Sequence, residues 1–247
     1  MHSHSRIGRT ILAPLTLAAV PASAAIVLLN PSFESPDIGN GLPSNGNGTT
    51  GGFYTTGGWS GGSTYLVDNN TTQNQYFNQP VPDGQQAASL AGQYFGQQLN
   101  DSVNGAIMTG TTAQQFDIAF SAGRRSGNTA VGSFTVLLQA YNGSTYVGNL
   151  ASQTYYAGAN DGNSSTIDLN LGVGNWTSTP INVSLTAPAN LFAGNNIRLI
   201  FAQNSPYGTN PLSGEMAIDN VSITAVPATS VVLLGGLGLL ALLRRRR

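Results

Sequence analysis

Apolar and polar residues alternate with a period of two in several short segments of this 247-residue chain. Such alternation is typical of a β-strand with one buried face, because successive side chains of a strand point to opposite sides. Stretches rich in Gly, Asn, Ser and Thr separate the segments and predict loops. The pattern predicts an all-β fold, an antiparallel two-sheet sandwich. Its expected strands include 115–121, 133–139, 165–171, 181–185, 196–201 and 217–223.

The two ends of the chain differ from the rest. Residues 1–24 have a basic start, an apolar run from Ile11 to Val20 and a small-x-small site at 22–24. This layout predicts a secretory signal peptide with a helical apolar region. The chain is therefore expected to fall into three parts: the signal peptide (1–24), a sandwich domain (25–225, here called the body) and a C-terminal segment (226–247).

The C-terminal segment predicts a single transmembrane helix. Pro227–Leu243 carries no charge, and a helix of this length spans roughly 26 Å, at the low end for a bilayer core of about 30 Å. A helix docked on a soluble core would need a polar face, which Ser230–Leu243 lacks. The positive-inside rule places the terminal arginines in the cytoplasm. The anchor residues are Leu233, Leu234, Leu239, Leu240, Arg244, Arg245, Arg246 and Arg247.

This segment resembles the PEP-CTERM sorting signal of Gram-negative bacteria. The resemblance rests on Val226 and Pro227, the short apolar stretch and the arginine cluster. It implies an exosortase-type processing enzyme as a partner, inner-membrane anchoring of a precursor that faces the periplasm, and later display at the cell surface or in the extracellular matrix. The usual Val-Pro-Glu-Pro reads Val-Pro-Ala-Thr at 226–229. A GlyGly-type tail is an alternative, with Gly235–Gly236 inside the apolar block.

The composition of the body excludes several chemistries. The chain has no cysteine and no lysine, and both histidines lie in the signal peptide. A Ser-His-Asp triad, a zinc site, a Schiff base and a disulfide are therefore not expected. All ten acidic residues lie in the body beside three arginines, which leaves a formal charge of −7. This charge excludes nucleic acid as a partner.

The body also resembles galactose-binding-like jelly rolls, including carbohydrate-binding modules. The motifs that carry the resemblance are NPSFESP at 30–36, Gly-Gly-Trp ending at Trp59, and AIDNVSI at 217–223. It implies one structural calcium ion held with the help of Glu34 and Asp219. The alternation places Asp219 on the buried face with Ala217 and Val221, where a carboxylate is costly unless it is paired or metal-bound. A salt bridge from Arg198 or Arg124, or solvation at a strand end, is the alternative.

Sugar binding requires exposed aromatic rings and planar polar groups. The candidates are Trp59, Tyr155, Tyr156, Trp176 and Arg124, with Tyr94, Tyr141, Arg125, Gln139 and Gln153 also available. Of the consecutive Tyr155 and Tyr156, one ring must face outward on a strand. Trp59 also fits a core position, and Trp176 fits a loop-capping role.

These observations favour a non-catalytic surface protein that contacts extracellular polysaccharide or biofilm matrix. A structural or adhesive protein without a small ligand is the alternative. A glycoside hydrolase with two catalytic carboxylates is a remote third, since no acid lies in a recognisable catalytic motif.

Overall fold

The protein is described here from a computed structural model. It describes residues 25–35, 58–61, 65–68, 77–90, 94–103, 105–126, 131–159, 162–204 and 214–226, all within one compact unit, Ser23–Ala228. The predicted signal peptide, Pro227 and the rest of the membrane anchor lie outside these residues. Across the described ranges, no helix is long and apolar enough to cross a membrane.

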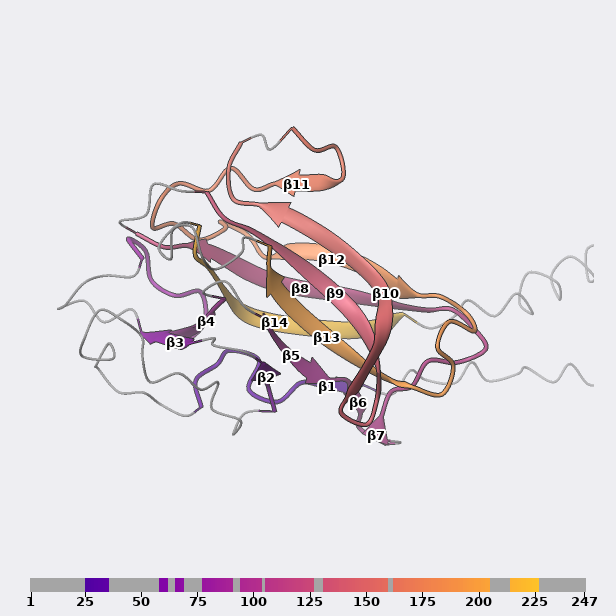
Figure 1. Ribbon diagram of the computed structural model, residues 1–247. Helices are drawn as coiled ribbons and strands as arrows, with labels where there is room; N and C mark the ends of the chain where they lie inside the picture. The colour runs from indigo at the N-terminus through magenta and orange to yellow at the C-terminus, as the bar shows by residue number, and fades with distance from the viewer. Residues whose placement is uncertain are drawn as a thin grey trace, which may run out of the picture. The chain divides into compact units, whose positions relative to one another are not determined.

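The body is a β-sandwich of two main sheets (Figure 1). One sheet has six strands in the order β11 (Thr166–Asp168), β10 (Thr145–Tyr156), β9 (Ser133–Asn142), β13 (Asn196–Gln203), β5 (Tyr94–Gln98) and β2 (Ser60–Gly61). The other has five, in the order β12 (Ile181–Ala187), β8 (Gln114–Arg124), β14 (Met216–Val226), β4 (Gln86–Ser89) and β3 (Tyr65–Asp68). A small sheet contains β1 (Ile26–Val27), β6 (Asn100–Asp101) and β7 (Gly105–Ala106).

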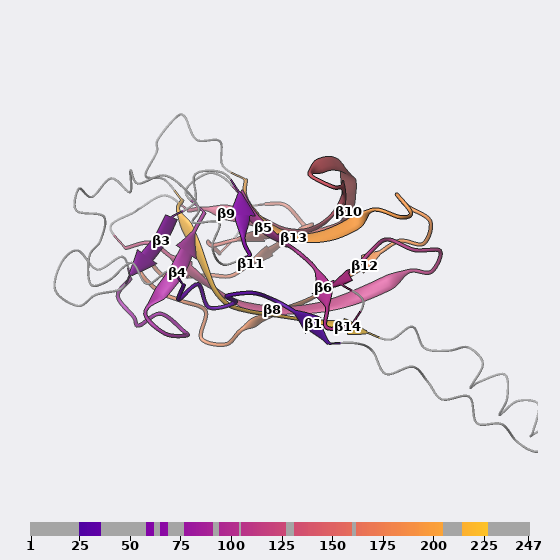
Figure 2. The same cartoon turned by 90° about the horizontal axis from the view of Figure 1, so that it is seen from below.

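Aromatic rings from both main sheets form the core between them. Phe120 of β8 packs edge-on against Phe134 of β9, Tyr155 of β10 and Phe201 of β13, with ring centroids 5.2 to 5.9 Å apart. Edge-to-face packing of this kind adds to the stabilisation that comes from burial alone. The all-β sandwich expected from the alternation is confirmed, and Figure 2 shows its two layers from below.

Two expectations about strands were wrong. The segment 165–171 was expected to be one alternating strand, but β11 is only Thr166–Asp168 and Ile167 is 45% exposed. This strand also runs parallel to β10, whereas an antiparallel sandwich was expected. The long strand β10 was missed, because register shifts between Tyr146 and Gly148 and between Asn149 and Ala151 interrupt its alternation.

A β-bulge in β14 reverses the expected orientation of part of that strand. The pairing with β8 shifts register between Asp219 and Ser222, and Asn220 adopts a left-handed φ of 50°. The extra residue changes which face each side chain occupies. Ala217 therefore packs in a small outer cluster, whereas Val221 packs in the main core. The expectation that Asp219 shares a face with Val221 was wrong, although Asp219 is buried.

The outer cluster covers one end of the five-stranded sheet. Trp176 lies in it against Phe77, with ring centroids 4.5 Å apart. Gly123 of β8 makes this approach possible, since a Cβ there would lie 2.8 Å from the Trp176 ring. Trp176 therefore packs on the outside of the sheet as a structural residue.

Candidate functional site

The N-terminal motif NPSFES forms a tight turn that packs against the bulge of β14. Asn30 and Phe33 both have left-handed φ values, 50° and 60°, and the Phe33 N–H donates to the Asn30 carbonyl at 3.2 Å. The Val221 N–H donates to the Pro31 carbonyl at 3.0 Å. Two segments far apart in the sequence, both with strained backbone, are thus joined at one place. Such strain persists where the surrounding structure fixes it, often at a ligand site.

Glu34 binds the turn before β4. Its Oε1 accepts hydrogen bonds from the backbone N–H groups of Gln85 and Gln86, at 2.9 and 2.8 Å. Gly84 has a φ of 76°, and a Cβ at that position would lie 2.3 Å from Glu34. The glycine therefore supplies both the turn conformation and the space for the carboxylate. Ser32 donates to Asp83 Oδ2 at 2.5 Å in the same region.

Asp219 is fully buried beside this turn. Its Oδ2 accepts from the Asp83 N–H at 2.8 Å, while its Oδ1 is buried and has no hydrogen-bond partner among the described residues. The pKa of Asp219 is raised to about 7, mainly by burial. Hydrogen bonds from the backbone N–H groups of Asp83 and Asn220 lower the pKa, and the negative charges of Asp83 and Glu34 raise it. A buried carboxylate near two others is costly when ionised, unless a cation is present.

The structure offers one oxygen at this turn to the calcium ion that the resemblance implies. Calcium prefers hard oxygen ligands, and Asp219 Oδ1 is such an oxygen without another partner. In the described ranges no three His, Cys, Asp or Glu side chains come close enough to bind a metal by themselves. Backbone carbonyls would therefore have to complete the shell, as calcium sites allow.

The alternative salt bridge to Arg198 or Arg124 is not found. Arg124 is buried and donates from Nη1 to the Leu171 carbonyl at 3.1 Å. Arg198 lies in the other sheet and stacks on Tyr141, with its Cζ 3.9 Å from the ring centroid. Of the described residues, only Arg125 and Glu215 form an ion pair, with Arg125 Nη1 2.6 Å from Glu215 Oε2.

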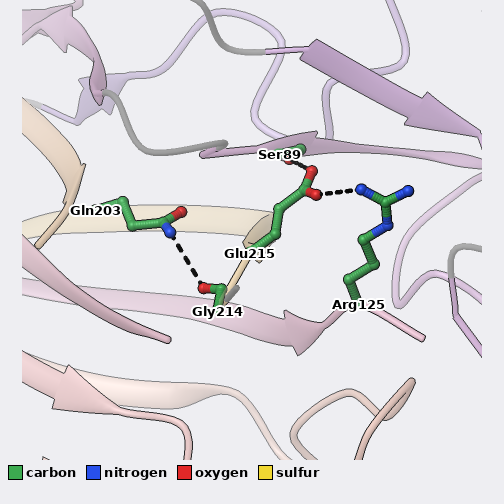
Figure 3. A network of polar contacts seen from close by, with 5 residues as sticks. All are labelled: Ser89, Arg125, Gln203, Gly214 and Glu215. Carbon is green, nitrogen blue, oxygen red and sulfur yellow. Dashed lines mark hydrogen bonds and ion pairs between the residues drawn. The ribbon is translucent and has the colours of Figure 1, made fainter. Parts of the chain in front are cut away.

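That ion pair belongs to a network of polar contacts around the start of β14 (Figure 3). Glu215 lies between Arg125 and Ser89, accepting from Arg125 Nη1 through Oε2 and from Ser89 Oγ through Oε1. Gln203 donates to the neighbouring Gly214 carbonyl at 3.2 Å. The network joins β4 to the start of β14.

Four of the five sugar-binding candidates are buried. Trp59 is 1% exposed in the main core and donates from its ring nitrogen to the Asn30 carbonyl at 3.0 Å. Tyr155 stacks on Phe134 in the core, and Trp176 and Arg124 are also buried. None of these four has an exposed face for a sugar. Tyr156 is half-buried and points away from the core, as the outward ring of its pair.

An exposed aromatic and polar cluster lies instead on the outer face of the six-stranded sheet, where β10, β9 and β13 pair side by side (Figure 1). We call it the Tyr–Arg face. Its members are Tyr146 and Asn149 of β10, Gln139 and Tyr141 of β9, and Arg198 of β13. Register places Tyr146 opposite Tyr141, and Gln139 between Asn149 and Arg198.

Hydrogen bonds connect these side chains into one unit. Tyr141 donates to Gln139 Oε1 at 3.1 Å, and Gln139 Nε2 donates to Asn149 Oδ1 at 2.9 Å. The Tyr146 hydroxyl donates to the same Asn149 oxygen at 3.0 Å. Tyr146 is 50% exposed, and its ring centroid lies 5.8 Å from that of Tyr141. A rigid, exposed arrangement of rings and planar polar groups results.

Neighbouring groups also shift the pKa of Tyr141 on this face. Burial raises the pKa of Tyr141, the Arg198 charge lowers it, and the hydroxyls of Tyr94 and Tyr146 raise it. Tyr94 of β5 is 49% exposed and pairs with Ala202 of β13 in the same sheet. Sequence reasoning had named Tyr94, Tyr141 and Gln139 as available but missed Tyr146 and Asn149, because β10 was not recognised as a strand.

Comparison with known proteins identifies the family. Residues 24–224 match a family model named HpiC1-like, described as HpiC1 cyclase. The chain belongs to the HpiC1-like family. No curated protein gives a significant match to this HpiC1-like chain.

Several solved structures are similar to this HpiC1-like chain at low scores. Two are the CBM22-1-GH10 modules of xylanase 10B from Clostridium thermocellum complexed with xylohexaose, and the CBM22-1 xylan-binding domain of Paenibacillus barcinonensis Xyn10C. They share 16% and 11% identity, each over 70% of this chain, with TM-scores of 0.37. The chain spans 27% of the first and 89% of the second.

A third similar structure is the K3 cleaved adhesin domain of Lys-gingipain from Porphyromonas gingivalis. It shares 12% identity over 65% of this chain and 91% of its own, with a TM-score of 0.31. Scores this low carry no conclusion about a ligand of this HpiC1-like chain.

Proposed function

We propose that this protein is a non-catalytic module that contacts extracellular polysaccharide through the Tyr–Arg face, on a jelly-roll domain of the galactose-binding-like kind. The observation that carries the proposal is the exposed Tyr146 ring, held by Asn149 within a hydrogen-bonded cluster. A tyrosine ring offers an apolar face for a sugar ring and a polar hydroxyl for its edge.

Preorganisation supports this proposal. Each polar side chain of the face already has a partner that fixes its orientation. Binding then requires little loss of side-chain entropy, which otherwise costs about 0.5–1.5 kcal/mol for each immobilised side chain.

We propose that export and anchoring accompany this function. The signal peptide would direct secretion, the segment Pro227–Leu243 would hold the precursor in the inner membrane, and an exosortase-type enzyme would process it at Val226–Pro227. One calcium ion, held with the help of Glu34 and Asp219, would stabilise the body. The orphan Asp219 Oδ1 supports the calcium ion.

The proposal is tested by measuring polysaccharide binding with the body, residues 26–225, on a glycan array and by affinity electrophoresis. Tyr146→Ala is expected to weaken binding by about tenfold or more, since loss of one stacking ring costs at least about 1.4 kcal/mol. Ile167→Ala is the matched control. Ile167 is an exposed apolar residue of β11, which pairs with the end of β10 that is far from Tyr146. Equal binding by wild type and Tyr146→Ala would refute the role of this face, and no binding to any polysaccharide would refute the function.

The family description favours a second function, a cyclase. Proton transfer in a cyclisation requires an acid or base positioned in a water-excluded site. Glu215, buried between Ser89 and Arg125, is one side chain in the described part that could take that role. Turnover of an unsaturated small molecule by the isolated body, with loss in Glu215→Gln, would establish this second function.

A further inference from the structure

We infer that the polysaccharide bound by the Tyr–Arg face is acidic, and that Arg198 binds an anionic group on it, such as a uronate carboxylate. This inference rests on the proposed function and specifies its ligand class. It follows from the charges of the body and from the geometry of one guanidinium group.

Arg198 differs from the other two arginines of the body in its environment. Arg124 is buried and donates to the Leu171 carbonyl, and Arg125 is neutralised by Glu215. Arg198 is half-buried on the outer sheet face, and no carboxylate of the described residues lies within ion-pair distance of it. In a domain with ten acidic residues and no lysine, an arginine without an acidic partner is unexpected.

The position of the guanidinium group is fixed. Its Cζ lies 3.9 Å from the Tyr141 ring centroid, and its Nη2 donates to the Gly143 carbonyl at 3.0 Å. Its Nε is buried and has no hydrogen-bond partner among the described residues. A buried donor left without an acceptor is unfavourable, more so when it is charged. The group is therefore held in place by the Tyr141 ring and the Gly143 carbonyl, and neither of these carries a negative charge.

The described neighbours of Arg198 do not compensate its charge. Register places Gln139 on one side and Gln98 on the other, both neutral. Gln98 in turn accepts from Asn196 at 3.3 Å and donates to Asn100 at 3.1 Å. The cation thus lies among amide side chains and stacks on Tyr141, whose ring in turn packs against the exposed Tyr146 ring.

An anionic sugar is a better match for this arrangement than a neutral one. Hydrogen bonds from arginine to an ionised oxygen are roughly twice as strong as neutral ones, and the planar guanidinium suits carboxylates. A neutral hydroxyl would accept a hydrogen bond but leave the charge unpaired.

The net negative charge of the body does not prevent this contact. Screening limits repulsion beyond about 8–10 Å at 0.1–0.15 M salt. Glu34, Asp83 and Asp219 lie at the N-terminal turn, and Asp117 is bound by Ser184 of β12 in the other sheet. Asp101 of β6, three residues after Gln98, accepts a hydrogen bond from the Val103 N–H. The contact between Arg198 and the anionic group of the ligand therefore decides whether the body prefers a charged or a neutral polysaccharide.

The experiment compares two matched pairs of ligands by titration calorimetry with the body. One pair is short oligogalacturonides and their methyl esters, in which a neutral ester replaces each charged carboxylate; the other is dextran sulfate and dextran. Wild type is expected to bind the oligogalacturonides at least about tenfold more tightly than the esters, with a preference that falls as salt increases. A preference for dextran sulfate alone would assign a sulfate ester as the anionic group in place of the carboxylate.

Arg198→Gln is expected to abolish the preference and keep binding to the neutral ligand. Arg198→Lys, which keeps the charge, is expected to retain part of the preference, and Ile167→Ala to retain all of it. Equal binding of charged and neutral ligands by wild type, lost in Tyr146→Ala, would overturn this inference and leave the proposed function standing. Arg198→Gln with an unchanged preference would also overturn it, whereas no binding to either pair refutes the proposed function.

Discussion

The clearest quantitative prediction concerns Asp219→Asn. The wild-type carboxylate is fully buried, and its pKa is raised from 3.8 to about 7, first by burial. A difference of this size corresponds to about 4 kcal/mol between the protonated and ionised forms, an upper value because the structure can relax. Asparagine has the same shape without the charge, and its amide would replace the orphan Oδ1 with a donor near Asp83 and Glu34.

The sign of the effect depends on pH and on calcium. The pKa of Asp219 is higher in the folded state than in the unfolded state. Its contribution to the stability of the wild type is therefore fully present below about pH 4 and is lost as pH rises to about 7. Without metal, Asp219→Asn is therefore expected to match the wild type near pH 4 and to exceed its unfolding free energy by up to about 4 kcal/mol at pH 8. With calcium at about 100 times its Kd, the wild type gains about 2.7 kcal/mol that the variant largely lacks.

The assay is urea unfolding of the body, wild type and Asp219→Asn, between pH 4 and 8 in excess chelator and in excess calcium. Comparing the two proteins at each pH removes contributions that they share, such as that of Asp117, whose pKa is lowered by hydrogen bonds from Ser184 and Gln115. A stability difference that does not change with pH would refute the buried-charge reasoning. Equal stability of the wild type in calcium and in chelator would remove the metal from this site.

Two further predictions concern packing and topology. Gly123→Ala is expected to cost about 1–3 kcal/mol of unfolding free energy, because the new Cβ would lie 2.8 Å from the Trp176 ring. Gly110→Ala is its control, since a Cβ there would meet nothing closer than 4.0 Å, and a similar loss in both variants would contradict this packing. In cells, protease added from the periplasmic side is expected to degrade the body of the uncleaved precursor, and a protected body would contradict the proposed anchor topology.

The sequence alone determined the fold class and the excluded chemistries. Strict alternation at Phe116, Ile118 and Phe120 and at Ile197, Leu199 and Phe201 predicted strands that are found, because such a strand must bury one whole face. The absence of cysteine and lysine and the position of both histidines required no structure. The motifs at 30–36 and 217–223 predicted Glu34 and Asp219 as site residues, and both accept hydrogen bonds from the turn before β4.

Only the tertiary structure decided which residues are exposed together. The bulge at Asn220 reverses the alternation within β14. The sequence of β14 does not predict it, because a bulge is a shift in the pairing with the partner strand. Trp59 and Tyr155 are aromatic like Tyr146, but packing against Phe33 and Phe134 removes them from solvent. The Tyr–Arg face joins Tyr146, Tyr141 and Arg198 through the register of three strands. Register depends on non-local pairing, which a period of two cannot specify.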